Sequence, residues 1–376
     1  MLGRIFAIFM VAFLFMLPCS AEEVNFDSEL SDIMEAVPDD IAGLLPDSFF
    51  EGVDGAAKGL DEVLEGGFWR ELLGDLFSDA LAAAAPSLFS LFGVLLVSAL
   101  ISTFKDTLRS EALSGAVSLA VSVVMISIFV KLASVHIETV VKYIDRLSYL
   151  CLAMLPMMGT LLAMGGSCGA AAATHGGFLM ILGVVEAVVG EAFGGIVGAS
   201  LALSASNVFS GKFKLAPIAK AIRRCFGIFF GIITSLLGFL LSIKIGIASA
   251  ADSVAMRGAK MLASNAIPMV GSAIGDSFKT LATALSYIKS VSGTVGIILL
   301  VLLALPVFIS VWLYRSGLVL LSGAAEMLGC ERERELISGV VSVYGYILAV
   351  VAIVTVVFIL MLALFTKTAL AFGGGI

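Results

Sequence analysis

Long apolar runs separated by short polar connections dominate the sequence after residue 80. Seven of these runs are close to, or longer than, the roughly 20 residues that an α-helix needs to cross a bilayer. They cover 81–104, 112–134, 147–166, 177–206, 225–251, 293–314 and 338–366. The pattern predicts an all-α, polytopic transmembrane helical bundle of six or seven spans. The run 177–206 is long enough to tilt or to re-enter the membrane.

Between residues 252 and 292 the pattern changes from continuous to periodic. Apolar residues recur there at intervals of three and four, which places them on one face of a helix. They are Ile267, Val270, Ile274, Phe278, Leu281, Leu285 and Ile288. This spacing indicates an amphipathic or re-entrant helix near 264–290, which lies along the membrane, enters it or packs on other helices.

The N-terminal residues 1–21 have the pattern of a cleavable signal peptide. Arg4 precedes an apolar run of 13 residues, and small residues at Cys19 and Ala21 fit a cleavage site after Ala21. An uncleaved anchor is the alternative. In either case the next segment, 22–80, is expected outside the cytoplasm as an acidic helical leader, followed by a multi-span membrane domain over 81–372.

Charge separates the leader from the membrane domain. Residues 22–79 carry 17 acidic and two basic residues, whereas 80–376 carry 12 acidic and 19 basic ones. Crossing the membrane seven times from outside would place the densest basic cluster, 207–224, outside as well. The positive-inside rule favours the opposite side. If one earlier run does not cross, the cluster moves inside, so the side of the C-terminus stays open.

Three ionisable residues interrupt or border the apolar runs, and they are candidate intramembrane polar residues. They are Glu186, Glu191 and Lys244. A charge in the hydrocarbon region costs several kcal/mol unless it is paired or hydrated. The two glutamates therefore either line a polar path or lie near a helix end, where they meet lipid headgroups.

Glycines at intervals of four are candidate helix-packing positions. They are Gly190, Gly194, Gly198, Gly227 and Gly231. On a helix this spacing aligns small residues on one face, where a second backbone can approach closely. The contact is expected either within one subunit or between subunits.

The segment 252–306 resembles the signature region of the stage III sporulation protein AE family. Its order runs from Asp252-Ser253-Val254 through Arg257-Gly258-Ala259-Lys260 and Ile267-Pro268-Met269-Val270-Gly271 to Asp276, and continues through Lys289, Gly293 and Gly296 to Pro306. Met269 departs conservatively from the β-branched residue expected there. The signature and assembly candidates are Asp252, Arg257, Lys260, Ile267, Pro268, Gly271 and Asp276.

The resemblance implies a role in endospore formation, in a channel-like or secretion-like complex that sustains late forespore development. The implied location is the mother-cell membrane around the forespore. The implied partners are other membrane proteins of the stage III sporulation A operon and a forespore partner. We also expect contact with membrane lipid and allow for a homo-oligomer of this chain. A small-molecule or ion permease is the alternative function, and a scaffold that docks partners through the leader is a third.

Enzymatic and nucleic-acid-binding functions are not expected. Gly165-Gly166-Ser167-Cys168-Gly169 matches G-x-S-x-G, but it lies in a connection between apolar runs rather than at a strand–turn–helix. The sequence contains only two histidines and no H-E-x-x-H or phosphate-loop motif. We therefore expect no catalytic residue, no cofactor and no metal. We interpret the basic cluster as facing lipid.

Overall fold

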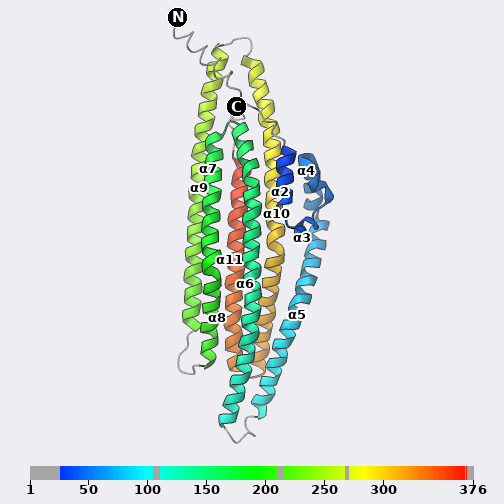
Figure 1. The fold of residues 1–376 in the computed structure, drawn as a ribbon, viewed down its shortest axis with the longest axis vertical. Helices are drawn as coiled ribbons and strands as arrows, with labels where there is room; N and C mark the ends of the chain where they lie inside the picture. Colours follow the sequence, from blue (N-terminus) through cyan, green and yellow to red (C-terminus); the bar gives the residue numbers. More distant parts are fainter. Residues whose placement is uncertain (1–25, 105–110, 210–215, 267–270, 369, 371–376) are drawn as a thin grey trace.

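The computed structural model describes residues 26–104, 111–209, 216–266, 271–368 and 370. Within these residues every regular element is helical (Figure 1). A leader of short helices, α2 (Phe26–Glu35), α3 (Asp39–Ala42), η1 (Asp47–Phe50) and α4 (Gly52–Leu64), precedes a bundle of long ones. Side chains at 102–104, 111–118, 191, 207–209, 216, 259–260, 262–266 and 271–279 lie outside the description.

Six helical stretches of the described chain are long and apolar enough to cross a membrane. They run side by side along the long axis of the molecule (Figure 1). The helices are α5 (Gly66–Phe104), α6 (Glu111–Met164), α7 (Cys168–Val185) with η2 (Glu186–Phe193) and α8 (Gly194–Phe209), α9 (Ala216–Ala266), α10 (Gly271–Met327) and α11 (Glu331–Lys367). The prediction of an all-α polytopic bundle is confirmed, with six spans.

The apolar runs 112–134 and 147–166 belong to one helix, α6, of 54 residues. The charged residues between them divide the hydropathy pattern but do not break the helix. Lys131, Glu138, Lys142 and Arg146 lie on exposed positions, and Glu138 pairs with Lys142 at 2.7 Å one turn away. A solvated charged face is compatible with a continuous backbone hydrogen-bond ladder, so the seven apolar runs make six spans.

The run 177–206 is likewise one helical course. Its middle, Glu186–Phe193, is π-helical, and α7 and α8 continue from it without a described break. The predicted amphipathic helix near 264–290 is not a separate element. Its first residues end α9 and its larger part begins α10, whereas 267–270 lie outside the described residues. A re-entrant course is not confirmed.

This merging changes the number of crossings that precede the basic cluster. Thr160, near the end of α6, donates to Glu29 of the leader, so this end of the bundle is the leader end. The facing ends of α8 and α9, which flank the basic cluster, lie at the opposite end (Figure 1). If the leader is outside, as predicted, the basic cluster is inside, which is the side that the positive-inside rule favours. Helix α11 then ends on the same side as the leader.

The leader packs against the bundle instead of standing apart from it. Phe49, Ala56 and Val63 are fully buried, and Gly59 lies under the Phe49 ring, where a Cβ would clash. Asp40 pairs with Arg146 of α6 at 2.8 Å. The boundary predicted at residue 80 falls inside α5, so one helix joins the leader to the first span.

Helices α10 and α11 form the interior of the bundle, with α5 and α6 beside them. Val311 and Leu318 of α10 and Val343, Ile347 and Phe358 of α11 have no exposed surface. Side chains therefore fill the centre of the described bundle.

Candidate functional site

A cluster of one histidine and two tyrosines lies inside the bundle, about halfway along α6. The His136 ring lies 4.5 Å from the Tyr314 ring and 5.1 Å from the Tyr344 ring, edge-on to both. His136 Nδ1 lies 2.8 Å from the Leu132 carbonyl oxygen, which can only accept, so Nδ1 carries the proton. Tyr344 Oη lies 3.1 Å from the same nitrogen.

Two further contacts extend this cluster to the neighbouring helices. The Tyr314 hydroxyl donates to the Ala83 carbonyl of α5 at 3.0 Å, which joins α5 to α10. Next to Tyr314, Arg315 lies against Gly345 of α11, where an added Cβ would be 3.4 Å from Arg315 Nε. That nitrogen is buried without a hydrogen-bond partner among the described residues.

A buried carboxylate lies closer to the end of the bundle that carries the basic cluster. Glu333 of α11 is only 6% exposed and accepts a 2.7 Å hydrogen bond from Ser98 of α5. On α9, the guanidinium of Arg223 donates to Ser342 of α11 at 3.0 Å. We call His136, Arg223, Tyr314, Arg315, Glu333 and Tyr344 the polar layer, because they place polar groups of α6, α9, α10 and α11 inside an otherwise apolar bundle.

The polar layer can hold helices in register and bind a charged or polar group. No group of three or more metal-ligating side chains occurs in the part of the chain that the structure describes. Ser167 of the G-x-S-x-G match is fully buried in the turn between α6 and α7. Its surroundings are helical on both sides, so it does not occupy a nucleophile elbow.

Among the predicted signature residues, Asp252 has a defined contact. Its Oδ2 accepts a 2.9 Å hydrogen bond from the backbone N–H of Ala170, in the first turn of α7. The α7 N-cap residue, Ser167, makes no side-chain cap of its own. Asp252 of α9 therefore caps α7 across the helix–helix interface, and Gly169 lets its carboxylate approach, because a Cβ there would lie 2.9 Å from Asp252 Oδ1.

The other signature candidates belong to the end of α9, the start of α10 and the undescribed residues between them. Arg257 is exposed on α9. Ile267 and Pro268 lie outside the described residues, and the side chains of Lys260, Gly271 and Asp276 are not described. Further along the resemblance, Lys289 is buried and donates to the carbonyl of Thr368, just after the end of α11.

The predicted packing glycines are not the close contacts of the described bundle. A Cβ at Gly190, Gly198, Gly227 or Gly231 would meet no atom within 4 Å, and one at Gly194 would meet Ile137 at an ordinary 3.7 Å. Other glycines let helices approach within the chain. Gly293 and Gly296 of α10, Gly317 of α10 and Gly339 of α11 lie against Thr366, Met154, Leu88 and Ser204, respectively. A four-residue spacing aligns glycines but does not specify which face meets a neighbour.

Two of the three candidate intramembrane charges, Glu186 and Lys244, lie on the outside of the bundle. Glu186 opens the π-helical segment and is exposed, and Lys244 of α9 is exposed as well. The side chain of Glu191 is not described. Glu186 and Lys244 therefore do not line a path through the described interior, nor does Glu186 lie at a helix end or at a re-entrant turn.

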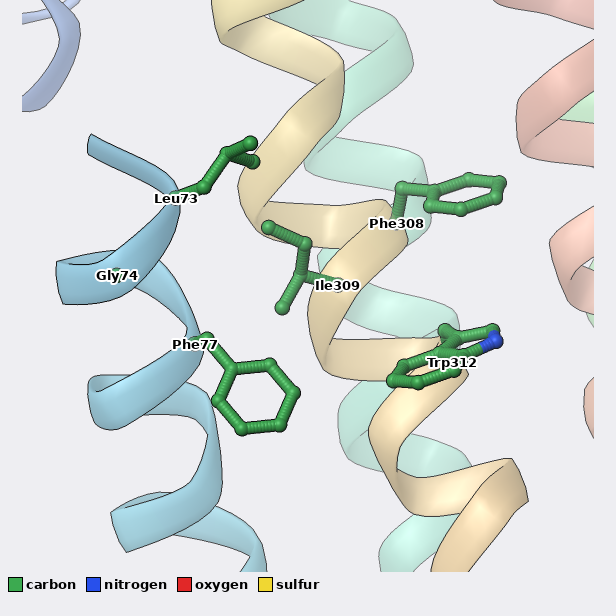
Figure 2. A pocket seen from close by; sticks show the side chains of 6 residues that line it. All are labelled: Leu73, Gly74, Phe77, Phe308, Ile309 and Trp312. Carbon is green, nitrogen blue, oxygen red and sulfur yellow. The ribbon is translucent and has the colours of Figure 1, made fainter. Parts of the chain in front are cut away.

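An apolar groove of about 420 Å³ runs between α5 and α10 (Figure 2). The groove is lined by Leu73, Gly74 and Phe77 of α5 and by Phe308, Ile309 and Trp312 of α10, and Figure 2 shows Leu73, Phe77 and Ile309 pointing toward the opposite helix. Leu73 and Phe77 belong to the leader, so this part of the leader borders the groove with α10.

Sequence reasoning missed most of the polar layer. His136 lies in the charged part of α6 that separates two apolar runs, and Tyr314 and Tyr344 are ordinary members of apolar segments. Arg223 lies in the basic cluster 207–224 that separates two apolar runs, but it belongs to α9, which starts at residue 216. Arg315 is visible in the sequence because it directly follows the apolar run 293–314.

Comparison with known proteins agrees with the resemblance at the signature. Residues 52–369 match the family described as stage III sporulation protein AE. The chain is 25% identical to the stage III sporulation protein AE of Bacillus subtilis (strain 168) over 350 residues, which covers 89% of this chain and 84% of the relative. No solved structure matches. Because the family match spans most of the sequence and reaches from the leader through all six spans, this chain belongs to the stage III sporulation protein AE family.

Proposed function

We propose that this chain is a membrane subunit of a sporulation-specific, channel-like or secretion-like complex between mother cell and forespore, required for late forespore development. Family membership over residues 52–369 carries the proposal. The six long helices support it, because they make the chain a multi-pass membrane protein of the kind such a complex needs.

The dimensions of the bundle suit a membrane base with a part that projects from the bilayer. With 54 residues, α6 is about 80 Å long, whereas the hydrocarbon core of a bilayer is about 30 Å thick. The leader packs on the end of α6 that receives Glu29. In this proposal, the leader and the projecting helix ends contact the partner proteins.

A conduit through the middle of one subunit is not supported by the packing. Tyr344, Phe358 and Phe365 of the central helix α11 have no exposed surface. We therefore propose that any passage forms between this subunit and other subunits, either further copies or other membrane proteins of the stage III sporulation A operon. The exposed Glu186 and Lys244 would then lie at protein contacts or in a shared aqueous space.

The first test is the timing and place of a fluorescent fusion to the full-length chain in its native host. We expect signal only during sporulation, in the mother-cell membrane around the forespore. Signal in growing cells, spread evenly around the envelope, would contradict the proposal. Co-purification from sporulating cells then tests the partners, with the operon's other membrane proteins expected in the eluate and unrelated polytopic proteins as the control.

A further inference from the structure

Arg223 is a buried cation for which the described residues supply no counter-charge. It is 6% exposed, and Nη2 donates to Ser342 Oγ at 3.0 Å. Nη1 is buried and meets no hydrogen-bond partner in the described part of the chain. No carboxylate of the described chain forms an ion pair with it. Burying a charge is costly unless it is paired, so this guanidinium has the property of an incomplete site.

Two helix faces meet beside Arg223. Phe193, Val197, Ser200 and Ser204 recur at intervals of four, three and four, and all are buried. The opposing face of α11 presents Gly339, Ser342 and Tyr346 at intervals of three and four. Phe193 stacks on Tyr346 at one end of this contact, and Ser204 lies against Gly339 at the other. Ser200 therefore lies between them, at the level of Ser342.

The groups around Ser342 share a second property, which is unused hydrogen-bonding capacity. Ser200 Oγ and Tyr346 Oη are buried and have no hydrogen-bond partner among the described residues. Ser200 is 1% exposed and Tyr346 is 7% exposed. A guanidinium with an unpaired N–H and nearby hydroxyls that can each donate make a set matched to an anion rather than to a cation.

The site lies near the start of α9, where the basic cluster ends and the apolar run that starts at residue 225 begins. Lys220 and Arg224, within one turn of Arg223, are exposed. Exposed basic residues at such a boundary attract the anionic headgroups of the adjacent leaflet. Ser342 is only half-buried, which leaves an approach from the edge of the bundle.

We propose that Arg223, with Ser200, Ser342 and Tyr346, binds a phosphate group between α8, α9 and α11. The phosphate belongs either to the headgroup of an anionic phospholipid or to free inorganic phosphate. Arg223 supplies the charge and a planar pair of N–H donors, which match two phosphate oxygens. The hydroxyls orient the group and satisfy its remaining oxygens. Binding ties α9 to α11 at the end of the bundle opposite the leader.

The test uses the full-length protein in a neutral detergent. Thermal unfolding is followed while phosphatidylglycerol or inorganic phosphate is titrated, with phosphatidylcholine and sodium chloride at equal ionic strength as reference additions. We expect phosphatidylglycerol to raise the unfolding midpoint of the unmodified protein, and Arg223→Gln to lower its apparent affinity about tenfold or more. Arg224→Gln removes the same charge from the next, exposed position, which attracts headgroups but lies outside the buried site, and should lower the apparent affinity less than Arg223→Gln does.

Each outcome decides the proposal or its source of phosphate. Stabilisation by phosphatidylglycerol alone identifies a headgroup site, and stabilisation by inorganic phosphate as well identifies a site open to the free anion. Equal responses of Arg223→Gln and Arg224→Gln, or no response to either phosphate, would overturn the proposal. If Arg223→Gln does not fold, Tyr346→Phe and Ser342→Ala keep the charge, and each should weaken binding. Unchanged binding in both would overturn the assignment.

Discussion

Helices α11 and α9 are both long and apolar, yet they hold opposite positions in the bundle. Phe358 of α11 is fully buried, whereas Phe239 of α9 is 63% exposed. Along α11, side chains on several faces meet α5, α6, α8, α9 and α10, whereas α9 contributes mainly one stripe to the interior. An apolar composition indicates that a helix suits lipid, but the burial of its side chains depends on how many other helices surround it. The comparison shows that apolarity alone does not identify the core of a membrane protein.

The largest expected effect tests this contrast with one substitution in each helix. Phe358→Ala should lower the free energy of unfolding by about 3 kcal/mol, the low end for aqueous cores, because separated helices in lipid keep apolar surroundings while a cavity still forms. Phe239→Ala should change it by less than about 0.5 kcal/mol. Reversible unfolding in mixed micelles measures both. Equal losses would contradict the burial contrast between α11 and α9.

The second prediction concerns how α9 is held to the rest of the bundle at the leader end. Asp252→Ala removes the carboxylate that caps α7, which should cost about 1 kcal/mol and speed amide hydrogen exchange in the first turn of α7. Asp252→Asn is the matched control, because its amide oxygen can still accept from Ala170. Exchange that stays unchanged at Ala170 in Asp252→Ala would show that the contact does not secure α9.

The fold class could be predicted from the sequence because the apolar runs are long, and five of the six candidate spans each follow from a single run. The continuity of α6 could not be predicted. The charges from Lys131 to Arg146 lower local hydropathy, but they lie on exposed positions that leave the helix intact. Hydropathy indicates whether a turn of helix suits lipid or water, whereas the continuity of the helix depends on its backbone hydrogen bonds. Because the sequence did not reveal this continuity, it left the side of the basic cluster open.

The site was less predictable because its residues come together only in three dimensions. Glycine spacing marked Gly227 and Gly231, yet the close approaches occur at Gly293, Gly296 and Gly339. The resemblance did identify Asp252, and the structure gives it a capping contact. By contrast, Arg223 is separated from Ser342 and Tyr346 by more than 100 residues of sequence, so no local pattern connects it to them.

The smallest expected effect concerns the leader, a second peripheral part of the molecule. Burial raises the pKa of the Glu29 carboxyl above its ordinary value of 4.5, a hydrogen bond from Thr160 opposes this, and the charge of Asp32 adds to it. The docked leader therefore binds the proton more tightly than the undocked leader. Docking should weaken as pH rises from 4.5 through the raised pKa and then level off.

Glu29→Gln should remove this pH dependence and dock the leader more firmly at neutral pH, because it removes the cost of burying the charge. Quenching between a fluorophore on α2 and a quencher on α6 of the full-length protein measures docking. Glu35→Gln, at an exposed position two turns along α2, should keep the slope of the unmodified protein. If the pH dependence survives in Glu29→Gln but disappears in Glu35→Gln, Glu35 rather than Glu29 is the group that titrates, and the prediction is wrong. The pH dependence of leader docking would then come from an exposed carboxylate, not from the contact between Glu29 and Thr160 of α6.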